Sequence, residues 1–254
     1  MVIRSLDLKK GDEILTTNHE YGALIKTWKY ICSQSGSKYI EYSPSLPLSS
    51  PSDFIEGLIG KINDKTKVIF ISQITSSTGL IFPVKKLCKE AKKRNILSII
   101  DGAHVPAHIS LSIKDINPDI YVGACHKWMM APKGTSFLYV RNQIQKKMKP
   151  LVISWGWESD YPGVSPFLDH NQWQGTNDIS SYLIIPDLID FREKYNWRDI
   201  SKKCREMNFE FRKRLIELFN EEQLCSHSTD WFGQMSSICI PDCDILNLYK
   251  FLKS

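Results

Sequence analysis

The sequence predicts an α/β protein with a doubly wound, mostly parallel sheet. Strand-like and helix-like segments alternate through the first half of the chain, which is typical of parallel strands joined by helical crossovers. One short apolar run ends in Asp101 and Gly102, and another leads through Gly123 to His126 and Lys127. Strands that reach a ligand crevice at the carboxyl edge of an open sheet have this pattern.

The hydrophobic pattern places the elements of the sheet in order. Strands are expected where short runs are rich in apolar or β-branched residues, at residues 12–17, 38–42, 68–72, 97–101, 120–122 and 136–140. Helices are expected at residues 19–33, 53–63 and 84–94. Apolar residues at helical spacing mark the first helix, and Pro51 and Pro83 mark the starts of the other two.

The second half of the chain has a different composition. Residues 151–177 are rich in Trp, Gly and Pro, which favours an ordered functional loop over a helix or a strand. Helices are expected at residues 186–195 and 199–220, and residues 231–240 are expected to begin a small α+β lobe. We therefore predict a large domain at residues 1–185 and the start of a small C-terminal domain at residues 186–254.

Composition argues against several classes of protein. The 33 basic and 28 acidic residues give a net charge of +5 and are scattered along the chain, so no nucleic-acid partner is predicted. No apolar run is as long as a membrane span, and residues 1–10 lack the apolar core of a signal peptide. We expect a cytoplasmic protein without a membrane partner.

Cysteine and histidine spacing does not predict a disulfide framework or a metal site. The seven cysteines form no CxxC pair, as a structural zinc site or a redox motif would require. His104 and His108 are four residues apart and could share a helix face, but no HExxH pattern or carboxylate cluster accompanies them.

Asp101 and Lys127 are the strongest candidates for chemistry. A lysine that is partly removed from water loses proton affinity and can attack a carbonyl compound to form a Schiff base. If that compound is pyridoxal phosphate (PLP), an acidic partner is needed on the ring nitrogen, because a protonated ring is the better electron sink. An isolated Asp and Lys are more often a strand-end cap and a surface amine, so the interpretation depends on the surrounding motifs.

Five motifs supply that context, in order along the chain. The segments are GDEILTTNHEYGA at 11–23, SQITSSTGLIFP at 72–83, DGAH at 101–104, CHKWMMAPKG at 125–134 and QWQGTND at 172–178. With them the chain resembles the class V aminotransferase family of PLP enzymes, of fold type I, and within it the proteins similar to isopenicillin N epimerase and cysteine desulfurases. Five ordered motifs are specific, whereas the dipeptide His-Lys alone would not be.

The resemblance implies a role for three residues at the cofactor ring. Lys127 would hold PLP as a Schiff base and, once free, would move the α-proton of an amino-acid substrate. Asp101 would keep the ring nitrogen protonated. Tyr21 would stack on the ring face, a contact worth about 1 kcal/mol beyond burial.

The resemblance also implies contacts around the rest of the cofactor. Ser76 would lie near the phenolic side, His104 would supply a hydrogen-bonding side chain, and His126 is expected among the cofactor-binding residues. Relatives pass a Gly-Thr pair across a dimer interface to the neighbouring subunit's cofactor phosphate. Thr176 would then act in trans, which implies a homodimer.

Departures from the family pattern leave a second interpretation open. Relatives carry an N-terminal Gly/Thr loop that binds the cofactor phosphate and a C-terminal arginine that binds the substrate carboxylate, and we expect both to lie outside this chain. Ala124 stands where relatives commonly have Ser or Asn. Asn177 stands where close relatives commonly have Arg. Each missing anion contact would cost about 1.5 to 3 kcal/mol. The alternative to an enzyme is therefore a truncated non-catalytic paralogue or a split-protein subunit, and the sequence does not choose among epimerisation, transamination and elimination or desulfuration.

Overall fold

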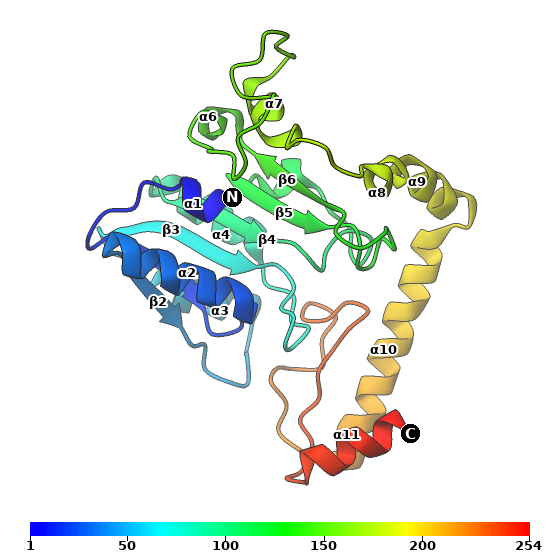
Figure 1. Cartoon of the computed structure of the whole chain (residues 1–254). Coiled ribbons are helices and arrows are strands. Elements are labelled where there is room, and N and C mark those ends of the chain that lie inside the picture. The colour runs from blue at the N-terminus through cyan, green and yellow to red at the C-terminus, as the bar shows by residue number, and fades with distance from the viewer.

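The structure, a computed structural model that describes residues 1–254, is built on one six-stranded sheet (Figure 1). The strands lie in the order β2-β1-β3-β4-β5-β6; all neighbours are parallel except β6, which runs antiparallel to β5. Their bounds are β1 (Glu13–Thr17), β2 (Lys38–Tyr42), β3 (Thr66–Ser72), β4 (Leu97–Asp101), β5 (Ile120–Ala124) and β6 (Ser136–Val140). The predicted mostly parallel α/β fold is confirmed.

Helices cover both faces of the sheet and bury two separate cores. Residues that alternate along β3 face opposite sides: Ile69 and Ile71 belong to a cluster of 20 buried residues, and Val68 and Phe70 to a cluster of 10. Helices α3 and α4 cover the larger cluster, and α1 and α2 the smaller one. The first four helices are α1 (Val2–Ser5), α2 (Gly22–Ser35), α3 (Pro51–Ile59) and α4 (Val84–Lys93).

Local signals explain where two helices differ from the predicted bounds. Helix α3 begins at Pro51 because the side chain of Ser50 accepts a hydrogen bond from the backbone N–H of Asp53 at 3.1 Å, which is an N-cap followed by proline at the first helical position. Helix α2 begins at Gly22, three residues later than predicted, because the side chain of Glu20 turns back to bind β3.

The second half of the chain is mainly helical. Its helices are α5 (Ile113–Ile116), α6 (Asn142–Gln145), α7 (Pro166–Gln172), α8 (Ser180–Leu183), α9 (Ile185–Lys194), α10 (Trp197–Phe219) and α11 (Ile245–Lys253). The prediction that residues 151–177 contain no helix is wrong, since α7 lies within them. The side chain of Ser165 caps α7 and Pro166 occupies its first turn, a start signal that the Trp, Gly and Pro composition obscured.

After α10 the chain returns toward the sheet before it forms α11 (Figure 1). Residues 231–240 form no regular strand, but Phe232 makes an isolated antiparallel bridge to Leu80, and Cys225 makes a parallel one to Leu48. This returning segment therefore packs over the carboxyl edge of the sheet.

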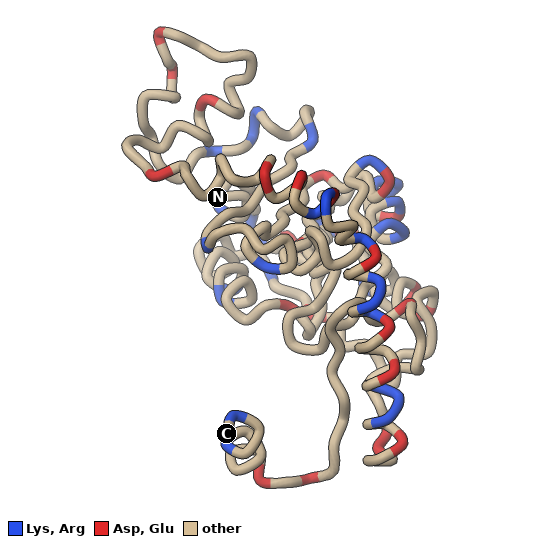
Figure 2. The backbone as a smooth tube through the Cα atoms, turned by 90° about the vertical axis from the view of Figure 1, so that its right-hand side faces the viewer, with Lys and Arg blue, Asp and Glu red and all other residues tan.

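Charges of both signs alternate along α10, and α11 stands apart from the sheet at the end of the chain (Figure 2). No helix combines the length and the apolar character needed to cross a bilayer.

Candidate active site

Asp101 and Lys127 meet at the carboxyl edge of the sheet. Asp101 is the last residue of β4, Lys127 lies three residues beyond β5, and the two strands are parallel neighbours. Burial raises the pKa of Asp101, while the N–H of Ala103, which donates to Oδ1 at 2.9 Å, and the charge of Lys127 lower it. Burial lowers the pKa of Lys127, and the charge of Asp101 raises it. The edge thus holds a carboxyl and a partly desolvated amine that act on each other.

His104 lies beside the lysine amine. Its Nε2 atom is 3.0 Å from Lys127 Nζ, and its Nδ1 atom accepts a hydrogen bond from the indole N–H of Trp128 at 3.3 Å. Burial, together with the charge of Lys127, lowers the pKa of His104 to about 4. The imidazole is therefore neutral at physiological pH.

A hollow of about 440 Å³ opens at this network. Its lining comes from four parts of the chain: the turn after β4, the loop after β5, the start of α10 and the segment after α10. The lining residues are His104, Lys127, Trp128, Met130, Trp197 and Gln234. Ligand sites in proteins commonly have volumes in this range. The lysine amine is therefore accessible to a small molecule.

Glu20 is a second carboxyl beside Asp101. Its Oε1 atom accepts from the hydroxyl of Thr17 at 2.6 Å, and Oε2 accepts from the backbone N–H and the hydroxyl of Ser72 at 2.8 and 2.7 Å. Burial raises the pKa of Glu20 to about 7, against the lowering effect of these hydrogen bonds, and the charge of Asp101 raises it further. The side chain thus links the carboxyl ends of β1 and β3 next to the site.

The other predicted cofactor residues make no hydrogen bond to Lys127, and three of them, Tyr21, Ser76 and His126, follow the carboxyl ends of β1, β3 and β5. Tyr21 precedes α2 with its side chain 54% exposed. Ser76 is exposed in the loop after β3. His126 is exposed, and its Nδ1–H donates to the carbonyl of Thr135 at 2.9 Å, which leaves Nε2 for another partner. Thr176 is exposed between α7 and α8 and makes no hydrogen bond to the site.

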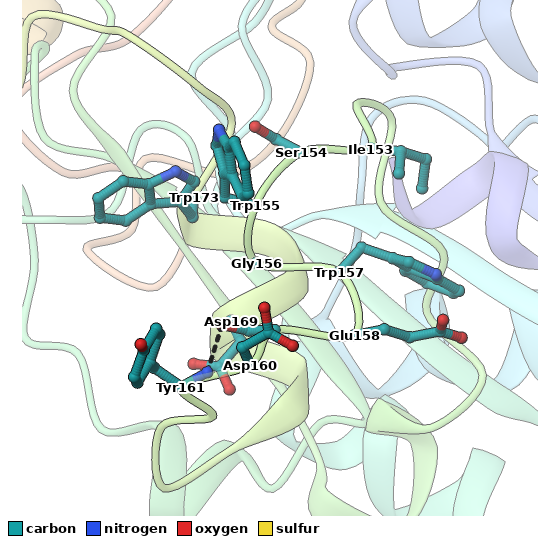
Figure 3. A pocket seen from close by; sticks show the side chains of 11 residues that line it. Ile153, Ser154, Trp155, Gly156, Trp157, Glu158, Asp160, Tyr161, Asp169 and Trp173 are labelled. Carbon is teal, nitrogen blue, oxygen red and sulfur yellow. Dashed lines mark hydrogen bonds between the residues drawn. The ribbon is translucent and has the colours of Figure 1, made fainter.

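A larger hollow, of about 690 Å³, lies elsewhere on the chain (Figure 3). Residues 153–161 form most of its wall, and Asp169 and Trp173 complete it. It shares no lining residue with the hollow at Lys127, and it contains no lysine or histidine. The candidate amine of Lys127 and the imidazole of His104 line the smaller hollow.

Sequence reasoning missed Glu20, Trp128, His108 and Gln234 as members of the site. An acidic residue three positions after the end of a buried strand was a usable signal for Glu20, and the position next to Lys127 was one for Trp128. Gln234 carried no signal, because only the return of the chain after α10 brings it to the hollow.

Comparison with known proteins gives consistent matches along the chain. The sequence profile of the family described as "Aminotransferase class-V" matches residues 1–254. Isopenicillin N epimerase from Streptomyces clavuligerus is 30% identical over 252 residues, which cover 95% of this chain and 63% of the epimerase. The chain thus spans less than two thirds of the length of this relative.

Solved structures share the fold. The apo structure of a cysteine desulfurase from Thermococcus onnurineus NA1 superposes with a TM-score of 0.80 at 18% identity, covering 99% of this chain and 63% of the desulfurase. A C-DES mutant in which glycine is covalently linked to the PLP cofactor superposes with a TM-score of 0.72 at 18% identity, covering 86% of this chain and 58% of that protein.

Proposed function

Because this chain belongs to the class V aminotransferase family, we propose that it is a PLP-dependent enzyme acting on an amino acid, with Lys127 as the residue that holds the cofactor. The observation that carries the proposal is the placement of Asp101 and Lys127 at or just beyond the ends of adjacent parallel strands, where the charge of each shifts the pKa of the other, beside a hollow of about 440 Å³. A buried acid and a partly desolvated lysine are the two groups that PLP chemistry requires of a protein.

The residues at this edge fit the ring end of PLP. Asp101 Oδ1 is bound to the N–H of Ala103, which orients the carboxyl while Oδ2 accepts no hydrogen bond from the chain and can face a ring nitrogen. Tyr21 offers an exposed aromatic face at the end of β1. Ser76, His104 and His126 add polar side chains from three loops at the carboxyl edge. These groups match the basic ring nitrogen and the aldehyde carbon of PLP.

Each side chain has a part in the proposed chemistry. When bound, PLP supplies an electron sink that stabilises negative charge at the substrate's α-carbon. Asp101 would hold the proton on the ring nitrogen, Tyr21 would pack on the ring face, and Lys127 Nζ would hold the cofactor and, once the substrate amine has released it, move a proton at the α-carbon. Epimerisation, transamination and C–S elimination or desulfuration would all begin with these steps. The products formed from a set of amino acids would distinguish among the reactions.

We further propose that the chain works as a homodimer, with Thr176 reaching the partner's cofactor. Large apolar side chains are exposed on the segment that leads to Thr176, including Trp155, Val164 and Trp173. Burial of such side chains at an interface is favourable. Sedimentation equilibrium tests the dimer, and a monomer at micromolar concentration contradicts it.

Trapping of PLP tests the attachment residue. The full chain is mixed with PLP and reduced with borohydride, beside Lys127→Ala and the matched control Lys133→Ala, which removes an exposed lysine from the same loop. We expect a visible absorbance band and a reduced adduct in the wild type and the control, and neither in Lys127→Ala. If excess PLP leaves no adduct on the wild type, the proposal fails and the non-catalytic interpretation is favoured.

A further inference from the structure

Trp128 fixes the position of the proton on His104. The indole N–H of Trp128 is a donor only, and it points at His104 Nδ1 from 3.3 Å. Nδ1 must therefore carry the lone pair. Because burial lowers the pKa of His104 to about 4, the ring is neutral and its single proton is on Nε2.

This tautomer determines which protonation state of Lys127 can form a hydrogen bond with His104. Nε2–H of His104 faces Lys127 Nζ at 3.0 Å. An ammonium group has no acceptor, so this contact is a hydrogen bond only when the lysine amine is neutral. The neutral amine is the form that attacks a carbonyl carbon.

His108 holds the indole in place. The rings of Trp128 and His108 lie one over the other, with centroids 4.0 Å apart and planes inclined by 32°. The backbone N–H of Gln234 donates to His108 Nε2 at 2.6 Å, so the ring proton is on Nδ1 and is donated to the carbonyl of His104 at 2.9 Å. Gly233 permits this approach, because a Cβ at that position would collide with the His108 ring.

We propose that Trp128 is a positioning residue that acts through His104 to keep the free amine of Lys127 neutral, and that His108 and the segment at Gly233 and Gln234 hold Trp128 for this task. The inference rests on the proposed function, since the neutral amine matters because Lys127 captures a carbonyl compound. It assigns a role to His108, which the spacing to His104 alone left as a weak metal-ligand candidate.

The charged groups around this network are few. Asp101, at the end of β4, raises the pKa of Lys127 against the effect of burial. Burial lowers the pKa of His108 to about 4; the hydrogen bond to His104 opposes this, and the charges of His104 and Arg205, on α10, add to it. His104 and His108 are therefore both neutral where Lys127 titrates, and the proton on His104 Nε2 is set by hydrogen bonding alone.

Nitrogen-15 NMR of histidine-labelled chain, without cofactor, tests the tautomer directly. His104 resonances are assigned by their loss in His104→Gln. We expect Nε2–H in the wild type at neutral pH, and a shift toward Nδ1–H in Trp128→Phe, which keeps a ring over His108 but removes the donor. Trp197→Phe is the matched control, because Trp197 lines the same hollow and makes no hydrogen bond to His104. An Nδ1–H tautomer or an imidazolium in the wild type overturns the proposal whether or not the variants fold.

The apparent pKa of Lys127 gives the second measurement, followed by the pH dependence of its modification with carbon-13 formaldehyde and borohydride. Loss of one hydrogen bond that favours the neutral amine raises the pKa of Lys127 and lowers the neutral fraction at a given pH by up to about tenfold. We expect this rise in pKa in Trp128→Phe and none in Trp197→Phe. An unchanged Lys127 pKa in a folded Trp128→Phe overturns the proposal. If the tautomer and the pKa respond as expected but PLP is not trapped, the proposed function fails and the positioning role of Trp128 stands.

Discussion

Replacing Glu20 by glutamine should make the protein more stable at neutral pH. Glutamine keeps the contacts of Glu20: its carbonyl oxygen can accept from the backbone N–H and the hydroxyl of Ser72, and its amide can donate to the hydroxyl of Thr17. The change therefore removes the ionisation and little else. The folded protein raises the pKa of Glu20 from 4.5 to about 7, and each pKa unit is worth about 1.4 kcal/mol, so the cost of ionising the buried carboxyl is about 3 kcal/mol.

The sign follows from proton binding in the two states. Below pH 4.5 Glu20 is protonated in both the folded and the unfolded chain, so the carboxyl does not change stability. Between pH 4.5 and about 7 the unfolded chain loses the proton and the folded chain keeps it, so the free energy of unfolding falls as the pH rises. Above about pH 7 Glu20 is ionised in both the folded and the unfolded chain, and the free energy of unfolding no longer changes with its titration. From pH 5 to pH 8 the wild type should therefore lose about 2.5 kcal/mol relative to Glu20→Gln.

Urea unfolding followed by tryptophan fluorescence at pH 5, 6, 7 and 8 measures this difference. Glu41→Gln, an exposed carboxyl on β2, serves as the control and should follow the wild type across the range. A constant gap between the wild type and Glu20→Gln from pH 5 to pH 8 would refute the reasoning, because it would mean that Glu20 titrates alike in both states.

Three further substitutions test the packing that supports the site. Trp28→Ala should lower the free energy of unfolding in urea by about 3 to 5 kcal/mol, because Trp28 is fully buried in the core under α2. Gly102→Ala should lower it by about 1 to 3 kcal/mol, because the new Cβ would collide with the ring and the hydroxyl of Tyr121 and disturb the hydrogen bond of that hydroxyl to Gln73. Asp119→Asn should lower the thermal midpoint, at a cost of about 1.5 to 3 kcal/mol, since Asp119 Oδ1 pairs with Arg141 at 2.9 Å and Oδ2 accepts twice from Ser98.

The sheet could be predicted from the sequence because its strands are short, nearly continuous apolar runs. Each such run, as at β3 and β4, faces a core on both sides, and this leaves a continuous apolar pattern. The ends of helices were harder to predict. Helix α7 depends on one capping serine inside a segment whose composition is otherwise that of a loop, and the start of α2 depends on a contact between Glu20 and β3, far away in sequence.

Candidate site residues could be predicted only where a single charged residue follows the apolar run of a strand. Asp101 and Lys127 were found in this way, since each follows an apolar run beside glycine. Their partners were not, because His108 and Gln234 reach the site through tertiary contacts between the turn after β4 and the segment after α10. Such contacts leave no local pattern in the sequence. Tyr21, Ser76, His126 and Thr176 remain predictions, and the PLP trapping experiment addresses the lysine on which they depend.

The surroundings of Glu20 and Asp101 shift the pKa values of the two carboxyls to different extents. Glu20 is the more deeply buried, and burial raises its pKa to about 7 despite three hydrogen bonds. Burial also raises the pKa of Asp101, but the N–H of Ala103, which donates to its Oδ1 atom, opposes that effect. Adjacent carboxyls cannot both ionise freely, and with a pKa of about 7 Glu20 keeps its proton for much of the time near neutral pH. Glu20 then adds little negative charge beside Asp101, the carboxyl that is proposed to face a protonated ring nitrogen, and Glu20→Gln should leave the Asp101 carboxyl and its hydrogen bond to Ala103 in place.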